Sequence, residues 1–152
     1  MWLCVKKNML RFFLQYKTTK TMIANIATCI TNGIKISVET FYQTEHSRPF
    51  ENKYIFAYRI TIENLGNYTS QLMRRHWYIH DATGLVREVE GEGVIGLQPI
   101  LAPMETHQYV SWCHLFADMG KMNGYYSFVR QNGEMFKVDI PEFQMCAPFK
   151  MN

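Results

Sequence analysis

The stretch YIFAYRITI, residues 54–62, decides the fold of this chain. Its large apolar side chains occupy every second position: Tyr54, Phe56, Tyr58, Ile60 and Ile62. Successive side chains of a β-strand point to opposite faces of the sheet, so this alternation predicts a long strand with one face in a core. Residues 34–38 repeat the pattern, because Ile34, Ile36 and Val38 alternate with polar residues.

Turn signals divide the rest of the chain into further short strands. Residues 64–67, 82–84 and 131–133 are rich in Asn and Gly, and the last of these is a strong hairpin signal. We expect strands over residues 69–81, 85–90, 106–114, 125–130, 135–140 and, after an interruption at Pro141, 143–146. On the first of them Met73, Trp77 and Ile79 should face inward. Many short strands without a helical period predict a single-domain, all-β antiparallel sandwich.

Composition is compatible with one folded domain. The chain has 152 residues, of which 47% are hydrophobic and 14% aromatic. Its formal charge is +3, but the first twenty residues contain no Asp or Glu and five basic side chains: Lys6, Lys7, Arg11, Lys17 and Lys20. The remainder is therefore mildly acidic, which gives no electrostatic footprint for binding nucleic acid.

The N-terminal segment differs from the rest. Basic residues break its apolar runs, so neither a secretory signal nor a transmembrane span is predicted. We expect residues 1–29 to lie outside the fold, with Met22 as the true start, and the domain to cover residues 30–150. The alternative for the segment is a short basic membrane anchor around residues 9–16. Cysteines without C-x-x-C spacing indicate reduced thiols in a cytoplasmic protein.

The segment GEGVIGLQP, residues 91–99, matches G-x-G-x-x-G, a dinucleotide-binding fingerprint. That fingerprint requires a helix to open at the last glycine, so that the helix N-terminus receives a pyrophosphate. Pro99 and Pro103 would interrupt such a helix. Residues 91–103, called the glycine loop below, are therefore predicted to be a glycine-hinged connection between strands. Its expected surface consists of Gly91, Glu92, Gly93, Gly96, Gln98 and Pro99.

Several ordered blocks carry a family resemblance. They are the glycine loop with Pro103, the G-x-M-x-G-x-Y block ending at Tyr126, residues 54–64, residues 72–77 and residues 138–143. Over residues 33–150 the chain resembles the ApaG family. The resemblance implies an immunoglobulin-like or fibronectin-III-like β-sandwich. Bacterial members are labelled cobalt/magnesium efflux proteins, and related domains occur in eukaryotic F-box proteins and in a DNA-polymerase-interacting protein. Met104 departs from the family, which usually has glycine there, and Ser111–His114 replaces smaller residues.

Two sets of residues have side chains that can act as metal ligands. His76 and His80 have the spacing of a helical zinc site, but on a strand they lie about 13 Å apart, too far to share one ion. We expect both to be exposed on a sheet face. Glu88, Glu90 and Glu92 alternate, so neighbouring carboxylates could hold a divalent cation through oxygen ligands. Solvated acids on an outer sheet face are the alternative.

No catalytic signature is present in the sequence, and Cys113 and His114 would face opposite sides of a strand. We therefore expect a noncatalytic binding module without a cofactor. The resemblance to the ApaG family implies that it acts through a protein partner in a process linked to cobalt/magnesium homeostasis. The alternatives are a site for a divalent metal or a pyrophosphate-bearing nucleotide, or a minor role in nucleotide metabolism. Interface residues are expected among large and basic side chains, namely Arg74, Arg75, Tyr78, Trp112 and Tyr126.

Overall fold

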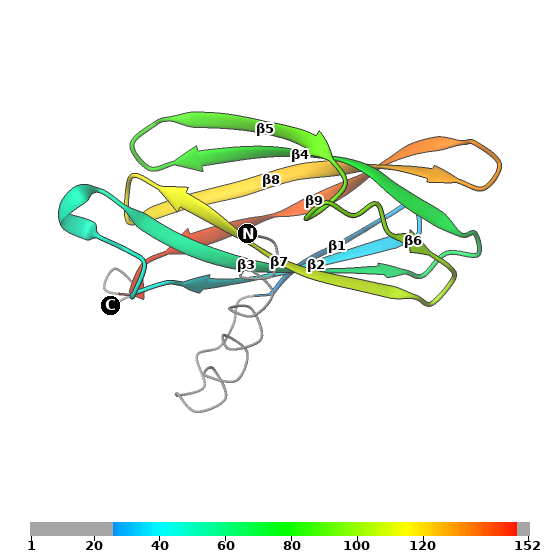
Figure 1. Ribbon diagram of the computed structural model, residues 1–152, viewed down its shortest axis with the longest axis horizontal. Coiled ribbons are helices and arrows are strands. Elements are labelled where there is room, and N and C mark those ends of the chain that lie inside the picture. The colour runs from blue at the N-terminus through cyan, green and yellow to red at the C-terminus, as the bar shows by residue number, and fades with distance from the viewer. Residues whose placement is uncertain (1–25, 149–152) are drawn as a thin grey trace, which may run out of the picture.

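Two antiparallel sheets pack face to face in the computed structural model, which describes residues 26–148 (Figure 1). The first sheet has the order β1-β2-β3-β7, and the second has the order β5-β4-β8-β9, with β6 pairing to β4. The strands are β1 (Ala27–Thr31), β2 (Ile34–Tyr42), β3 (Tyr54–Asn64), β4 (Ser70–Asp81), β5 (Val86–Glu92), β6 (Ile100–Leu101), β7 (Thr106–Leu115), β8 (Met119–Arg130) and β9 (Met135–Cys146). The predicted all-β sandwich is confirmed. The expectations for residues 1–21 lie outside the described residues.

The core lies between the sheets and contains the side chains that alternate along the predicted strands. In β3 the residues from Phe56 to Ile62 at every second position are buried, as are Ile34, Ile36 and Val38 in β2. Aromatic rings connect the two layers, because Tyr58 of β3 meets Trp77 of β4 edge-on at 5.6 Å between centroids. Among residues 26–148 no helix is long and apolar enough to cross a membrane.

The first strand begins before the predicted domain boundary at residue 30. β1 pairs with β2 from Ala27 onward, so residues 27–29 are part of the sandwich and the predicted extent of the extension was wrong there. β1 also reaches the second sheet, because the Cys29 thiol donates to the Asp139 carbonyl at 3.0 Å and the Asn32 amide donates to the Lys137 carbonyl. It thereby closes one edge of the sandwich.

A β-bulge interrupts the pairing of β4 with β8 between Leu72 and Arg74. A bulge places one extra residue in a strand, which reverses the face on which later side chains lie. Leu72 and Trp77 are therefore both buried although they are an odd number of residues apart. The prediction that Met73 faces inward was wrong, because Met73 is the residue at the bulge.

Pro141 does not interrupt the last strand, contrary to prediction. β9 runs continuously from Met135 to Cys146, and its pairing with β8 shifts register between Met122 and Gly124. A proline has no N–H to donate, so strands accept it at edges and irregularities. β9 is the last strand of its sheet, and the register shift lies opposite Pro141.

Asp81 links the β4–β5 turn to the β7–β8 connection. Its carboxylate accepts hydrogen bonds from the backbone N–H groups of Thr83 at 3.0 Å and Phe116 at 2.6 Å. Burial acts to raise the pKa of Asp81, but these donors outweigh it and hold the pKa below its ordinary value. The ionised side chain therefore stabilises the fold.

A chain that begins at Ile34 should melt more than about 5 °C below one that begins at Met22, because it lacks β1 and its contacts with both sheets. The comparison is made by thermal unfolding of the two purified proteins. Equal melting temperatures would show that β1 adds nothing to stability.

Asp81→Asn should lower the free energy of unfolding at pH 7 by about 1–2 kcal/mol, since one backbone N–H loses its acceptor. Because the pKa of Asp81 is lower in the folded than in the unfolded protein, its ionised carboxylate stabilises the fold at pH values above the unfolded-state pKa. This stabilisation is lost as the pH falls through the folded-state pKa. The difference from wild type should therefore shrink below about pH 4. Urea unfolding between pH 3 and pH 7 checks this, and a pH-independent difference would contradict it.

Candidate functional site

The glycine loop begins with a tight turn and not with a helix. Val94 and Leu97 exchange backbone hydrogen bonds of 2.7 and 3.0 Å, and the chain then continues into β6. Gly93 and Gly96 have left-handed φ angles of 58° and 71°. Ile95 shares this conformation with a φ of 48°, which is strained for a β-branched residue. The predicted glycine-hinged connection between strands is confirmed.

The bulge in β4 anchors this loop. The Met73 carbonyl accepts hydrogen bonds from the Gly93 N–H at 2.8 Å and from the Gln98 side-chain amide at 3.0 Å. Farther along, the Leu72 N–H donates to the Pro99 carbonyl at 3.0 Å. The exposed loop is therefore held at both ends by the irregular part of β4.

The Arg75 side chain holds the start of the glycine loop in place through hydrogen bonds. Its guanidinium donates to the carbonyls of Glu92 and Gly93 at 3.0 and 2.9 Å. A Cβ atom on Gly91 would lie 2.7 Å from this guanidinium, so a larger residue at this position would have to displace the end of the Arg75 side chain. Arg75 was predicted to be an interface residue. Its guanidinium positions the loop through these two hydrogen bonds, and a contact of Arg75 with a partner stays a prediction.

A depression of about 430 Å³ lies between the glycine loop and the start of β7. Leu97 and Ile100 form an apolar part of its lining, and they are 53% and 61% exposed. His107 lines the opposite side, and burial lowers its pKa. Its Nε2 atom is buried and finds no hydrogen-bond partner among the described residues. The depression therefore combines apolar walls with one imidazole side chain.

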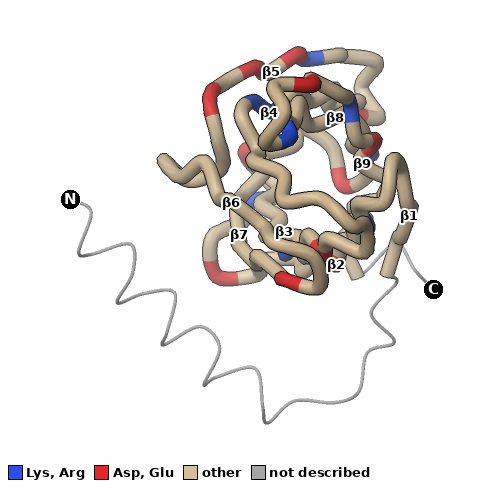
Figure 2. The backbone as a smooth tube through the Cα atoms, turned by 90° about the vertical axis from the view of Figure 1, so that its right-hand side faces the viewer, with Lys and Arg blue, Asp and Glu red and all other residues tan. Residues whose placement is uncertain are grey.

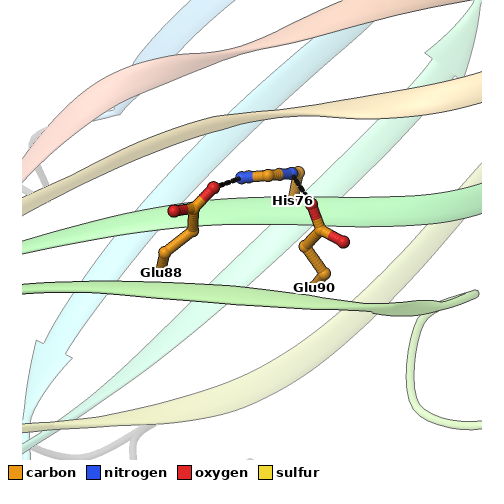
Figure 3. Close-up of side chains that lie close together, drawn as sticks. All are labelled: His76, Glu88 and Glu90. Atoms are coloured by element: carbon orange, nitrogen blue, oxygen red, sulfur yellow. Dashed lines mark hydrogen bonds and ion pairs between the residues drawn. The ribbon is translucent and has the colours of Figure 1, made fainter.

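A second constellation lies on the outer face of the second sheet, where His76 stands between Glu88 and Glu90 (Figure 3). His76 Nε2 lies 2.5 Å from a Glu88 oxygen, and Nδ1 lies 2.7 Å from a Glu90 oxygen. The pairing of β4 with β5 causes this arrangement, because His76 is opposite Glu90 and Tyr78 is opposite Glu88. We call these three residues the histidine–glutamate cluster.

His76 is only 7% exposed, so the prediction of an exposed histidine was wrong. The rings of Tyr125 and Tyr78 both lie 4.8 Å from the imidazole, centroid to centroid, and the first is stacked on it. The Tyr125 hydroxyl also lies 3.1 Å from Nδ1. The two tyrosine rings therefore hold the imidazole in one orientation and cover it on the outer face of the sheet.

The third predicted carboxylate does not join this cluster. The Glu92 carboxylate lies 3.9 Å from the Arg74 guanidinium, which is also 3.9 Å from Glu90. Acidic residues nevertheless follow one another along β5, at the top of the molecule in Figure 2. Glu88 and Glu90 are thus brought together as predicted, and His76 takes the place that was expected for Glu92.

The remaining interface candidates have different positions. Tyr126 was predicted to point outward, but it is fully buried and its hydroxyl is hydrogen-bonded to that of Tyr109. Tyr78 is half-buried beside the histidine–glutamate cluster. Trp112 is 46% exposed and borders a depression of about 560 Å³, where its ring meets His46 edge-on at 5.3 Å. Only Trp112 and Arg74 keep a plainly exposed position.

Cys113 is separated from solvent. It is buried, and burial raises its pKa to about 11. The thiol therefore stays protonated near neutral pH, and a thiolate is the form that acts as a nucleophile. This geometry provides no activated cysteine at this position.

Comparison with known proteins matches the ApaG domain to residues 44–130 of this chain. Protein ApaG of Brucella anthropi is 47% identical over 119 residues, which are 78% of this chain and 92% of that protein. The chain belongs to the ApaG family. Protein ApaG of Thiobacillus denitrificans is 47% identical over 76% of this chain and 91% of its own length. A solved structure of a Bordetella pertussis protein named ApaA superposes with a TM-score of 0.74 at 43% identity, covering 76% of this chain and 94% of that one.

One departure from the ApaG pattern has a structural counterpart. Met104 occupies the place where the family usually has glycine, and its φ is 69°, in the left-handed region that glycine adopts without strain. The Met104 N–H donates to the Asn64 carbonyl at 2.7 Å, which holds the turn in that shape. The backbone of this ApaG domain therefore keeps a conformation suited to glycine although the side chain has changed.

Gly93→Ala should destabilise the protein more than Gly84→Ala. Both glycines have positive φ angles, but a Cβ on Gly93 would lie 2.2 Å from the Leu97 carbonyl oxygen, whereas one on Gly84 meets nothing within 4 Å. Backbone strain alone should cost about 1 kcal/mol at Gly84, and the clash should raise the loss at Gly93 above about 2 kcal/mol. Chemical denaturation of both variants measures the difference, and equal losses would mean that the loop yields without cost.

Proposed function

We propose that this ApaG domain is a noncatalytic binding module that docks a protein partner on the glycine loop. The observation that carries the proposal is Ile95, an apolar β-branched residue that is 46% exposed and held at a left-handed φ of 48°. Strain of this kind persists only where the surroundings impose it, and it is concentrated at functional sites. The loop presents Ile95 in a fixed position at its tip.

The surroundings of Ile95 support an apolar contact. Leu97 and Ile100 are also exposed, and they line the depression that His107 borders. Because the loop is anchored at Met73 and Arg75, docking would cost little conformational entropy. An apolar side chain of the partner would fill the depression.

Charge indicates the rest of the partner's chemistry. Glu92 is exposed at the start of the loop, and Glu105 lines the depression. A partner segment that places basic residues around an apolar anchor would match this surface. We therefore favour a basic and apolar segment of another protein as the occupant.

The cellular part of the proposal rests on family membership. Since ApaG proteins carry a cobalt/magnesium label, we propose that the complex acts in the cytoplasm in a process linked to the homeostasis of these ions. A pyrophosphate-bearing nucleotide fits the loop less well. The turn at Val94–Leu97 leads into β6, so no helix N-terminus is available to a phosphate.

Leu97→Asp and Glu92→Lys should each weaken the complex at least about tenfold, because one places a charge on the apolar wall and the other reverses the charge beside it. Partners are captured on the immobilised full-length chain, a captured protein is purified, and its dissociation constants are measured by calorimetry. Ile95→Gly should also weaken binding while its melting temperature stays at or above that of wild type, because the substitution relieves strain.

Met135→Asp is the matched control, because Met135 is also an exposed apolar residue, at 68%, and it lies away from the loop at the start of β9. It should leave the affinity unchanged. In a deletion strain, the three loop variants should fail to restore growth under cobalt or magnesium stress, whereas the control should succeed. Normal affinity and full complementation by folded Leu97→Asp and Glu92→Lys proteins would reject the glycine loop as the docking surface.

A further inference from the structure

We propose that the histidine–glutamate cluster binds a divalent transition-metal cation such as Zn²⁺ or Co²⁺ through His76 Nε2 and one oxygen each of Glu88 and Glu90. The site lies on β4 and β5, on the outer face of the second sheet, and it does not depend on the docking proposal.

An excess of negative charge is the first argument. Two carboxylates lie within 2.7 Å of one imidazole, so the cluster stays negative even when the imidazole is protonated. Arg74 approaches Glu90 no closer than 3.9 Å and also faces Glu92, so it offsets little of this charge. A divalent cation would neutralise both carboxylates at once.

The fixed orientation of His76 is the second argument. Tyr125 and Tyr78 enclose the ring, and the Tyr125 hydroxyl lies 3.1 Å from Nδ1. A metal-bound histidine typically gives its other ring N–H to a neighbouring acceptor, which fixes the tautomer. The oxygen nearest to Nδ1 belongs to Glu90, at 2.7 Å. When Glu90 turns from Nδ1 towards the cation, the Tyr125 oxygen can accept the Nδ1 proton, which leaves Nε2, facing Glu88, as the ligand atom.

The distances require only side-chain adjustment. One ligand atom from each of the three residues can be chosen so that all lie within 4.8 Å of one another. Around a tetrahedral cation with bonds of about 2.1 Å, neighbouring ligand atoms are about 3.4 Å apart. Glu88 already lies 2.5 Å from Nε2, whereas Glu90 must turn from Nδ1 to the Nε2 side of the ring. Rotamer changes allow this movement, because the two side chains are 57% and 55% exposed. The strands that carry them remain in place.

The donor set indicates which cation is preferred. An imidazole nitrogen suits Zn²⁺ and Co²⁺, whereas Mg²⁺ favours oxygen ligands and retains several waters. Three protein ligands would leave at least one coordination position for water or for an outside group. The structure thus favours Zn²⁺ or Co²⁺ over Mg²⁺ at this cluster.

The test is calorimetric titration of the tag-free full chain with CoCl₂, ZnCl₂ and MgCl₂, combined with the visible d–d absorption of bound Co²⁺. Wild type should bind Co²⁺ and Zn²⁺ at one site more tightly than Mg²⁺. Glu88→Gln and Glu90→Gln should each weaken Co²⁺ binding at least about tenfold and alter the d–d spectrum. Both residues are exposed, so these isosteric variants should keep the fold, which circular dichroism verifies.

Glu92→Gln is the matched control, because it removes the same charge from the next outward position of β5 and supplies no ligand to the cluster, which it meets through Arg74, 3.9 Å from both Glu90 and Glu92. Its Co²⁺ affinity should stay within about threefold of wild type. His76→Gln, where it folds, should abolish the nitrogen contribution to the spectrum. Absence of saturable Co²⁺ binding in wild type, unchanged binding in Glu88→Gln and Glu90→Gln, or an equal loss in Glu92→Gln would each overturn the proposal.

Discussion

The glycine loop and the histidine–glutamate cluster both depend on the β-bulge at Met73. Upstream of it Leu72 faces the core, and downstream of it the inward positions fall on Arg75 and Trp77. Because the bulge reverses the faces of the later side chains of β4, Arg75 lies beneath the glycine loop and His76 lies on the outer face, opposite Glu90. The bulge also frees the Met73 carbonyl to accept two hydrogen bonds from the loop. One extra residue in one strand thereby places two unrelated groups of side chains.

The strained backbone near the loop depends on the same support. Ile95 and Met104 both adopt positive φ angles at the two ends of the connection between β5 and β7. Such conformations cost about 1–3 kcal/mol each, so the surrounding hydrogen bonds and packing must over-determine them. Val94, adjacent to Ile95, is almost fully buried, and Asn64 holds Met104 through its backbone carbonyl. The shape of the exposed surface is thus a property of the core beneath it.

The sandwich was predictable because a strand with one buried face needs an apolar side chain at every second position, and this pattern is visible in the sequence. Residues 34–38 and 54–62 show it without interruption, and both form central strands. The phase of β4 was not predictable, because a bulge leaves no reliable mark in the sequence. That Glu88 and Glu90 share a face follows from the alternation of side chains along a strand. To predict that His76 joins them, the register of the β4–β5 hairpin is needed as well. Counting outward from the turn at residues 82–84 would have placed His76 opposite Glu90. Tyr126 was misjudged because an aromatic side chain suits either face of a sheet.

The position of β5 at the end of its sheet has a consequence for solubility. The outer side of an edge strand carries unpaired N–H and C=O groups, which can template pairing with another chain. Val86 and Val89 are exposed on this strand and would favour such pairing. Three glutamates at alternating positions oppose it, because two copies of β5 aligned side by side would bring rows of like charge together. The acids of β5 therefore act as gatekeepers against edge-to-edge aggregation, whatever else they bind.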